Sequence, residues 1–116
     1  MKKTLWFIGV MTSVLVLSCN KSTDINIVTP TEGQSFSTGD MVEVKAKIYD
    51  PDWLSGVALT AITETGDTIY HYTVDLDAQS YTLLKRFQLT SPGMCKINID
   101  TWGGYGSSKS IMINVN

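Results

Sequence analysis

The chain has 116 residues, enough for one small domain, and its formal net charge at pH 7 is −2. All eleven acidic residues follow residue 18, whereas two of the nine basic residues precede it, so the remainder carries a net charge of −4. This balance excludes the basic stripe of nucleic-acid-binding proteins and provides no electrostatic attraction to anionic lipid headgroups.

The first 18 residues have the pattern of a secretory signal peptide. Lys2 and Lys3 form a cationic start, and an apolar run extends over residues 5–17. A helix of that length rises about 20 Å, short of the roughly 30 Å hydrocarbon core of a bilayer. A permanent membrane-spanning helix is therefore the less favoured alternative, and we expect residues 1–18 to be removed on export.

The segment Leu15-Val16-Leu17-Ser18-Cys19 resembles the lipobox of bacterial lipoproteins. The resemblance implies transfer of diacylglycerol to the Cys19 sulfur, cleavage before this residue and acylation of its new amine by a fatty acid such as palmitate. Two or three acyl chains, at about 0.8 kcal/mol per buried methylene, hold a protein at a membrane almost permanently. The residue after the cysteine is Asn20 and not the aspartate of inner-membrane lipoproteins, which favours the outer membrane, with the periplasmic or external face left open.

Residues 19–23 are then expected to be a lipidated tether, and residues 24–116 to form the folded domain. This domain carries the period-two alternation of half-buried strands, most clearly over residues 41–49, and no eleven-residue window holds a helical face. Turn residues such as Gly, Pro, Asn and Asp separate the segments. The remaining predicted strands are residues 25–29, 57–63, 68–76, 81–89, 95–101 and 110–115. Seven short strands without a helix predict an all-β antiparallel sandwich.

A resemblance to a known family supports this fold. The motif PxEGxxFxxGD over residues 30–40, followed by the 41–49 strand, is similar to bacterial immunoglobulin-like (Ig-like) domains of cell-surface lipoproteins. The closing half, residues 92–115, is similar as well. The resemblance implies an Ig-like β-sandwich used for adhesion, spacing or partner binding, and it names no ligand. The antibody-type cysteine pair is missing, because Val44 or Ala46 fills the second-strand position.

The one cysteine of the domain, Cys95, lies at an inward position of a predicted strand. If Cys19 is lipidated, Cys95 has no partner for an intrachain disulfide. A buried thiol behaves as a small apolar side chain, so we expect Cys95 to fill the core. A reactive thiol is less favoured, because no neighbouring histidine or cationic cluster would lower its pKa.

Two loops hold the candidate binding residues. In an Ig-like topology residues 50–56 and residues 100–106 lie side by side, which brings Trp53 together with Trp102 and Tyr105. Rigid aromatic side chains flanked by glycine and small polar residues provide contact area in paratopes and sugar-binding platforms. These three residues therefore form the candidate binding face. The alternative is that either tryptophan folds under its loop and closes the end of the core.

The same loops contain three carboxylates, Asp50, Asp52 and Asp100, which could supply oxygen ligands to calcium. Aspartate also accepts hydrogen bonds from backbone amides at turns, and this structural role is the favoured interpretation. We therefore expect no metal site.

Catalysis and cofactor binding are not indicated. The only histidine, His71, excludes a multi-histidine metal site and is expected in mid-strand, facing solvent or a cross-strand partner. The aromatic residues Tyr70, Tyr72, Tyr81 and Phe87 are expected to pack in cross-strand pairs and not to form a cofactor groove. No nucleophile elbow or phosphate loop is present in the sequence, so a small hydrolase is only a remote alternative.

The sequence thus predicts a small, non-catalytic envelope lipoprotein whose domain binds another macromolecule, either a protein or a glycan. Binding would use the loop end or an exposed sheet edge. A structural accessory subunit, packed permanently into a larger envelope complex, is the alternative.

Overall fold

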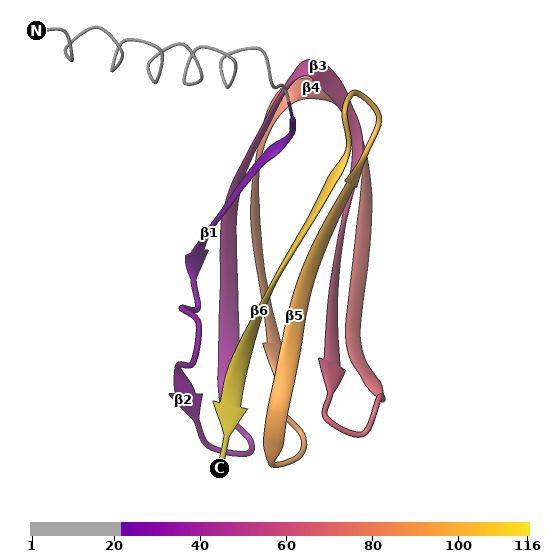
Figure 1. The fold of residues 1–116 in the computed structure, drawn as a ribbon. Helices are drawn as coiled ribbons and strands as arrows, with labels where there is room; N and C mark the ends of the chain where they lie inside the picture. Colours follow the sequence, from indigo (N-terminus) through magenta and orange to yellow (C-terminus); the bar gives the residue numbers. More distant parts are fainter. Residues whose placement is uncertain (1–21) are drawn as a thin grey trace, which may run out of the picture.

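The computed structural model describes residues 22–116, which form β-strands and no helix, so nothing in this range is a helix that could cross a membrane (Figure 1). The expected signal peptide and the first residues of the expected tether, residues 1–21, lie outside the described residues. The strands are β1 (Asp24–Thr29), β2 (Ser35–Phe36), β3 (Met41–Thr63), β4 (Thr68–Gln88), β5 (Gly93–Trp102) and β6 (Ser107–Val115).

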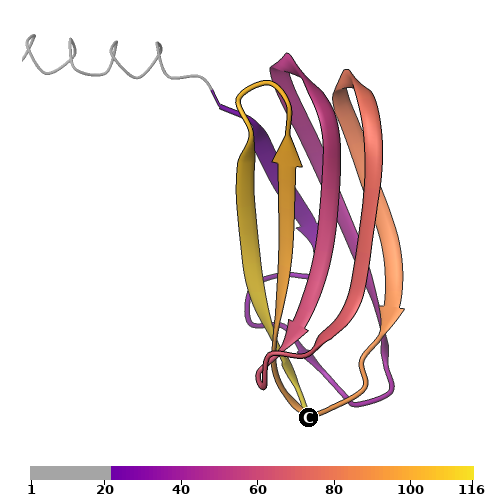
Figure 2. The same cartoon turned by 90° about the vertical axis from the view of Figure 1, so that its right-hand side faces the viewer.

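Strands β3 and β4 form one long antiparallel hairpin that is bent over at its middle, as Figures 1 and 2 both show. The ladder pairs residues 41–49 with residues 80–88, is interrupted over residues 50–53, and then pairs residues 54–62 with residues 68–78. The two halves of the hairpin therefore belong to different layers.

The layers make an antiparallel sandwich. One layer contains β1, the first half of β3 and the second half of β4. The other contains β2, β6, β5, the second half of β3 and the first half of β4. The short β2 is the exception to antiparallel pairing, because it runs parallel to the end of β6. The predicted all-β sandwich is confirmed, and bends join four of the seven predicted segments into the two long strands.

The core lies between the layers and is built from the predicted alternation. Every second side chain is buried over residues 42–48 and again over residues 95–101. Cys95 is one of these, with 2% of its surface exposed, and burial raises the pKa of its thiol. The other inward side chains of these two segments are Val42, Val44, Ala46, Ile48, Ile97, Ile99 and Thr101.

The aromatic side chains of β4 pack differently from the prediction. Tyr70 stacks on Phe87 with ring centroids 5.1 Å apart, and the Lys85 ammonium lies 4.0 Å from the centre of the Tyr72 ring. These pairs join the two halves of β4, and so the two layers, whereas neighbouring strands of one sheet were expected. The bend of β4 is the reason, because it brings one strand back over itself. Burial and the nearby Tyr72 raise the pKa of Tyr81 in the same group.

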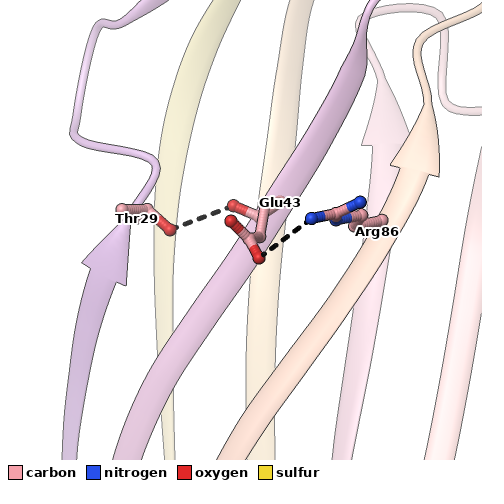
Figure 3. Close-up of polar contacts among 3 residues, drawn as sticks. All are labelled: Thr29, Glu43 and Arg86. Atoms are coloured by element: carbon pink, nitrogen blue, oxygen red, sulfur yellow. Dashed lines mark hydrogen bonds and ion pairs between the residues drawn. The ribbon is translucent and has the colours of Figure 1, made fainter.

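The outer face of the first layer is polar. The Glu43 carboxylate on β3 lies 3.7 Å from the Arg86 guanidinium on β4, and the Thr29 hydroxyl on β1 donates to the Glu43 carbonyl oxygen at 3.1 Å (Figure 3). Both charged side chains are exposed, so this ion pair contributes at most about 1 kcal/mol.

Candidate functional site

One end of the sandwich gathers the bends of β3 and β4, the β5–β6 turn and the start of β1 (Figure 1). Four aromatic side chains there, Tyr49, Trp53, Trp102 and Tyr105, are between 40% and 49% exposed. No other aromatic side chain within residues 22–116 is as exposed. We call this end the aromatic pole.

A buried carboxylate holds the pole together. Asp50 has no exposed surface, and its Oδ2 accepts hydrogen bonds from the Thr23 hydroxyl at 2.7 Å and the Tyr105 amide at 3.0 Å. Its Oδ1 accepts a bond from the Asp52 amide at 2.7 Å. One side chain therefore links the N-terminal entry, the β3 bend and the β5–β6 turn.

The same contacts set the protonation of Asp50. Burial alone would raise the pKa of this carboxyl, since it disfavours the charged form. The hydrogen bonds from Thr23 and from the backbone amides outweigh burial and leave the pKa below its ordinary value. Asp50 is therefore a buried, charged anchor.

Glycine is required where the β5–β6 turn approaches this anchor. Gly104 has φ of +54°, and a Cβ there would overlap the Asp50 carboxylate. Gly103 has φ of +85° and lies equally close to Ser55 on the β3 bend. The Thr101 hydroxyl closes the turn by accepting the Ser107 amide at 2.9 Å. These contacts explain why the turn is rich in glycine.

Trp53 is held outward by the bend of β3. Its backbone has φ of +76°, a left-handed conformation that is rare for a bulky residue. Its indole Nε1 donates to the Asp77 carboxylate on the bend of β4 at 2.6 Å, and the side chain remains 49% exposed. The bond orients the ring without burying it.

Trp102 lies on the outer face of its layer. It pairs with Gly56 across β3 and β5, and a Cβ on Gly56 would overlap the indole, so the ring rests on the glycine backbone. Trp102 is 40% exposed, whereas Leu54, in the bend beside them, is fully buried. The side chain that closes this end of the core is thus Leu54, and neither tryptophan does so.

The structure therefore brings Trp53, Trp102 and Tyr105 to one end of the domain, as the sequence predicted. It adds Tyr49, a residue not predicted for this face, which directly precedes the bend and is 48% exposed. It also places Thr23 in the folded domain, where it is 5% exposed, although the sequence assigned it to the tether.

Of the three aspartates considered for calcium, Asp50 and Asp100 accept hydrogen bonds from other groups, and Asp52 is exposed. The oxygens of Asp50 are occupied by the donors described above. Asp100 accepts a bond from the Asn98 amide at 2.7 Å on the outer face of β5. Across residues 22–116, no three His, Cys, Asp or Glu side chains are arranged to hold a metal ion.

His71 lies in the middle of the first half of β4 and is exposed. Its Nδ1 is 3.1 Å from the hydroxyl of Thr60, the residue that faces it across the ladder. The expected exposed, cross-strand position is confirmed.

No protein-family model matches the chain, and no curated protein matches its sequence. Solved structures share its fold. The CARDB domain of a Pyrococcus furiosus protein, solved in complex with di-metal ions, aligns with a TM-score of 0.55 and 12% identity over 83% of this chain and 89% of that one. The fibronectin(III)-like modules of Clostridium thermocellum CbhA align with a TM-score of 0.52 and 15% identity over 79% of this chain and 94% of that one.

The sulfur carrier protein SoxY from Chlorobium limicola f thiosulfatophilum also aligns, with a TM-score of 0.52 and 9% identity over 92% of this chain and 96% of that one. Identities this low show the fold alone. The domain has an Ig-like, fibronectin III-like fold.

Proposed function

We propose that the chain is an exported lipoprotein held at the outer membrane by acyl chains on Cys19, and that its domain is a non-catalytic module that binds another macromolecule. The observation that carries the proposal is the place where the folded domain begins. Thr23 is already buried and bonded to Asp50, four residues after the lipobox cysteine. Four residues span at most about 14 Å, so the domain would sit directly on its anchor.

The fold and its surfaces support a binding role. Ig-like modules recur as adhesion and recognition domains, and the four side chains of the aromatic pole provide exposed contact area. The polar partner of His71 is the Thr60 hydroxyl on the neighbouring strand, an arrangement that stabilises the sheet. For these reasons we propose binding and not catalysis.

A structural accessory subunit is the second candidate, and β4 favours it. Among the described strands, β4 pairs only with β3, so one side of its 21 residues is open. An open edge of this kind accepts a strand from another chain, which gives a permanent assembly. Affinity purification of the lipidated protein from envelopes separates the two roles. A stoichiometric, salt-resistant membrane complex identifies a subunit, whereas a soluble or extracellular ligand identifies a binder.

The anchor is tested by expressing the full chain in a Gram-negative host with labelled palmitate. We expect the label on the wild type and on Cys95→Ala, the matched control, and its loss from Cys19→Ala. Mass spectrometry of the wild type should show an acylated N-terminus at Cys19. Wild-type protein that retains Met1 or carries no fatty acid would contradict the proposal.

A further inference from the structure

We propose that the aromatic pole seats in the headgroup region of the membrane that holds Cys19, so that the domain stands on its loops with the C-terminal end pointing away. The proposal rests on the lipid anchor proposed above. It assigns the candidate binding face to a lipid surface, so the macromolecular partner of the proposed function would contact another face of the domain.

The chain enters the domain at the aromatic pole. The Thr23 hydroxyl bonds to Asp50 at 2.7 Å, and the same carboxylate accepts the amides of Asp52 and Tyr105. The point where the chain leaves the domain is thus tied to both aromatic loops. With a reach of at most about 14 Å between Cys19 and Thr23, an acylated Cys19 keeps this end against the bilayer in every conformation of the tether.

The exposed side chains of the pole are of the kinds that favour a membrane interface. Tryptophan and tyrosine are enriched at membrane interfaces, because their rings are apolar and their N–H or O–H groups remain hydrated. Here two tryptophans and two tyrosines are 40–49% exposed at the anchored end. The fold also keeps Trp53 in a left-handed conformation, at φ of +76°, with its indole outward.

The charges of the pole indicate how it would bind. The exposed carboxylates of Asp24, Asp52 and Asp77 lie beside the aromatic side chains, so anionic headgroups are not attracted electrostatically. Seating would come from insertion of the rings and from the high local concentration that the anchor imposes. It should therefore be insensitive to salt. The open edge of β4, which runs along the side of the sandwich, would remain free for a protein partner.

Intrinsic fluorescence tests the proposal, since Trp53 and Trp102 are the only tryptophans after residue 18. The chain beginning at Cys19 keeps all described strands, and its Cys19 can be coupled to a maleimide lipid while Cys95, 2% exposed, is spared. On vesicles of phosphatidylethanolamine and phosphatidylglycerol that contain brominated lipid, we expect the tryptophan emission to be blue-shifted and quenched relative to vesicles without bromine. High salt should leave the quenching unchanged.

A reporter at the other end is the matched control. Met41, at the far end of β3, is 57% exposed, so Met41→Trp in a chain with Trp53→Phe and Trp102→Phe should fluoresce without quenching. Unquenched pole tryptophans, or equal quenching at both ends, would overturn the seating. A blue shift that appears only when envelope proteins are added to the vesicles would also overturn the proposal, because a protein and not lipid would then cover the aromatic pole. Since the lipid is attached chemically, these results do not depend on acylation in cells, which the palmitate experiment decides.

Discussion

Replacement of the buried carboxylate at the pole, Asp50→Asn, is the sharpest test of how this end is built. The substitution keeps the size of the side chain but replaces one acceptor oxygen with an NH₂ donor. Asp50 accepts three hydrogen bonds, from the Thr23 hydroxyl and from the amides of Asp52 and Tyr105. An asparagine amide cannot accept all three, because its nitrogen would point at one or two of the donors.

The expected cost follows from counting the donors that lose their partner. The new NH₂ group would replace either Oδ1, which faces the Asp52 amide, or Oδ2, which faces the Tyr105 amide and the Thr23 hydroxyl. The first orientation leaves one donor unsatisfied, and each buried donor left without an acceptor costs about 1–3 kcal/mol. We therefore expect the free energy of unfolding to fall by about 1–3 kcal/mol, the cost of the orientation that leaves one donor unsatisfied. For a domain of this size, each kcal/mol lowers the melting temperature by roughly 4–8 °C.

The assay is chemical denaturation of the wild type and of Asp50→Asn over a range of pH. The folded protein holds the pKa of Asp50 below its ordinary value, so the charged carboxylate stabilises the fold fully above the unfolded pKa of about 4. As pH falls through the lowered folded pKa, that contribution is lost. The difference between the two proteins should thus be constant near neutral pH and shrink below about pH 4.

Asp52→Asn is the matched control, because Asp52 is exposed and gives Asp50 only its backbone amide. It should leave stability within about 0.5 kcal/mol of the wild type. Equal stability of Asp50→Asn and the wild type would refute the reasoning. So would a difference that grows in acid.

Four further predictions concern single side chains. Leu54→Ala should lower the free energy of unfolding by about 2–5 kcal/mol because Leu54 is fully buried, whereas Trp53→Ala should lower it by no more than about 1 kcal/mol. Denaturant titration measures both losses, and equal losses would contradict the conclusion that Leu54 closes this end of the core. Trp53→Gly should be more stable than Trp53→Ala by about 1 kcal/mol, because only glycine adopts φ of +76° without strain, and the reverse order would argue against that backbone. Gly56→Ala should lower the free energy of unfolding by about 1–3 kcal/mol, because the added methyl group overlaps Trp102. This loss should be smaller when Trp102→Ala is also present, and losses that simply add in the double variant would exclude the contact. The Cys95 thiol should resist iodoacetamide at about pH 8 until the protein is denatured, because burial hides it and raises its pKa, and labelling of the folded protein would show that it is open.

The strands could be predicted because each layer has one face in the core. Alternation over residues 42–48 and 95–101 specifies which side chains turn inward, and all of them are buried. The bends were harder to predict. Residues 50–53 contain Pro51 and two aspartates, which are typical of turns, yet they lie within β3 at the point where its ladder with β4 is interrupted and the chain crosses between layers. Hydrophobic periodicity does not reveal such a bend, because the alternation on either side of the bend is unchanged.

Most residues of the aromatic pole could be predicted from the sequence, but the hydrogen bonds that hold the pole together could not. Topology alone placed Trp53 near Trp102. The role of Asp50 depends on Thr23 and Tyr105, which are 27 and 55 residues away along the chain, and a sequence shows only local turn capping. Tyr49 was missed because alternation marks it as outward without saying that it ends next to the bend.

The central role of Asp50 connects the stability of the domain to its orientation. The carboxylate that binds both aromatic loops also binds Thr23, the first buried residue of the domain, so the attachment point cannot move away from the exposed rings while Asp50 stays charged and bonded. A surface loop alone would not impose this, since a loop held only by its own turn could swing relative to the chain entry. Loss of the Asp50 bonds should therefore have two separable effects, a lower free energy of unfolding and a looser domain on its anchor. On lipid vesicles, Asp50→Asn at a temperature where it remains folded should consequently show weaker quenching of Trp53 and Trp102 than the wild type, although both tryptophans are still present.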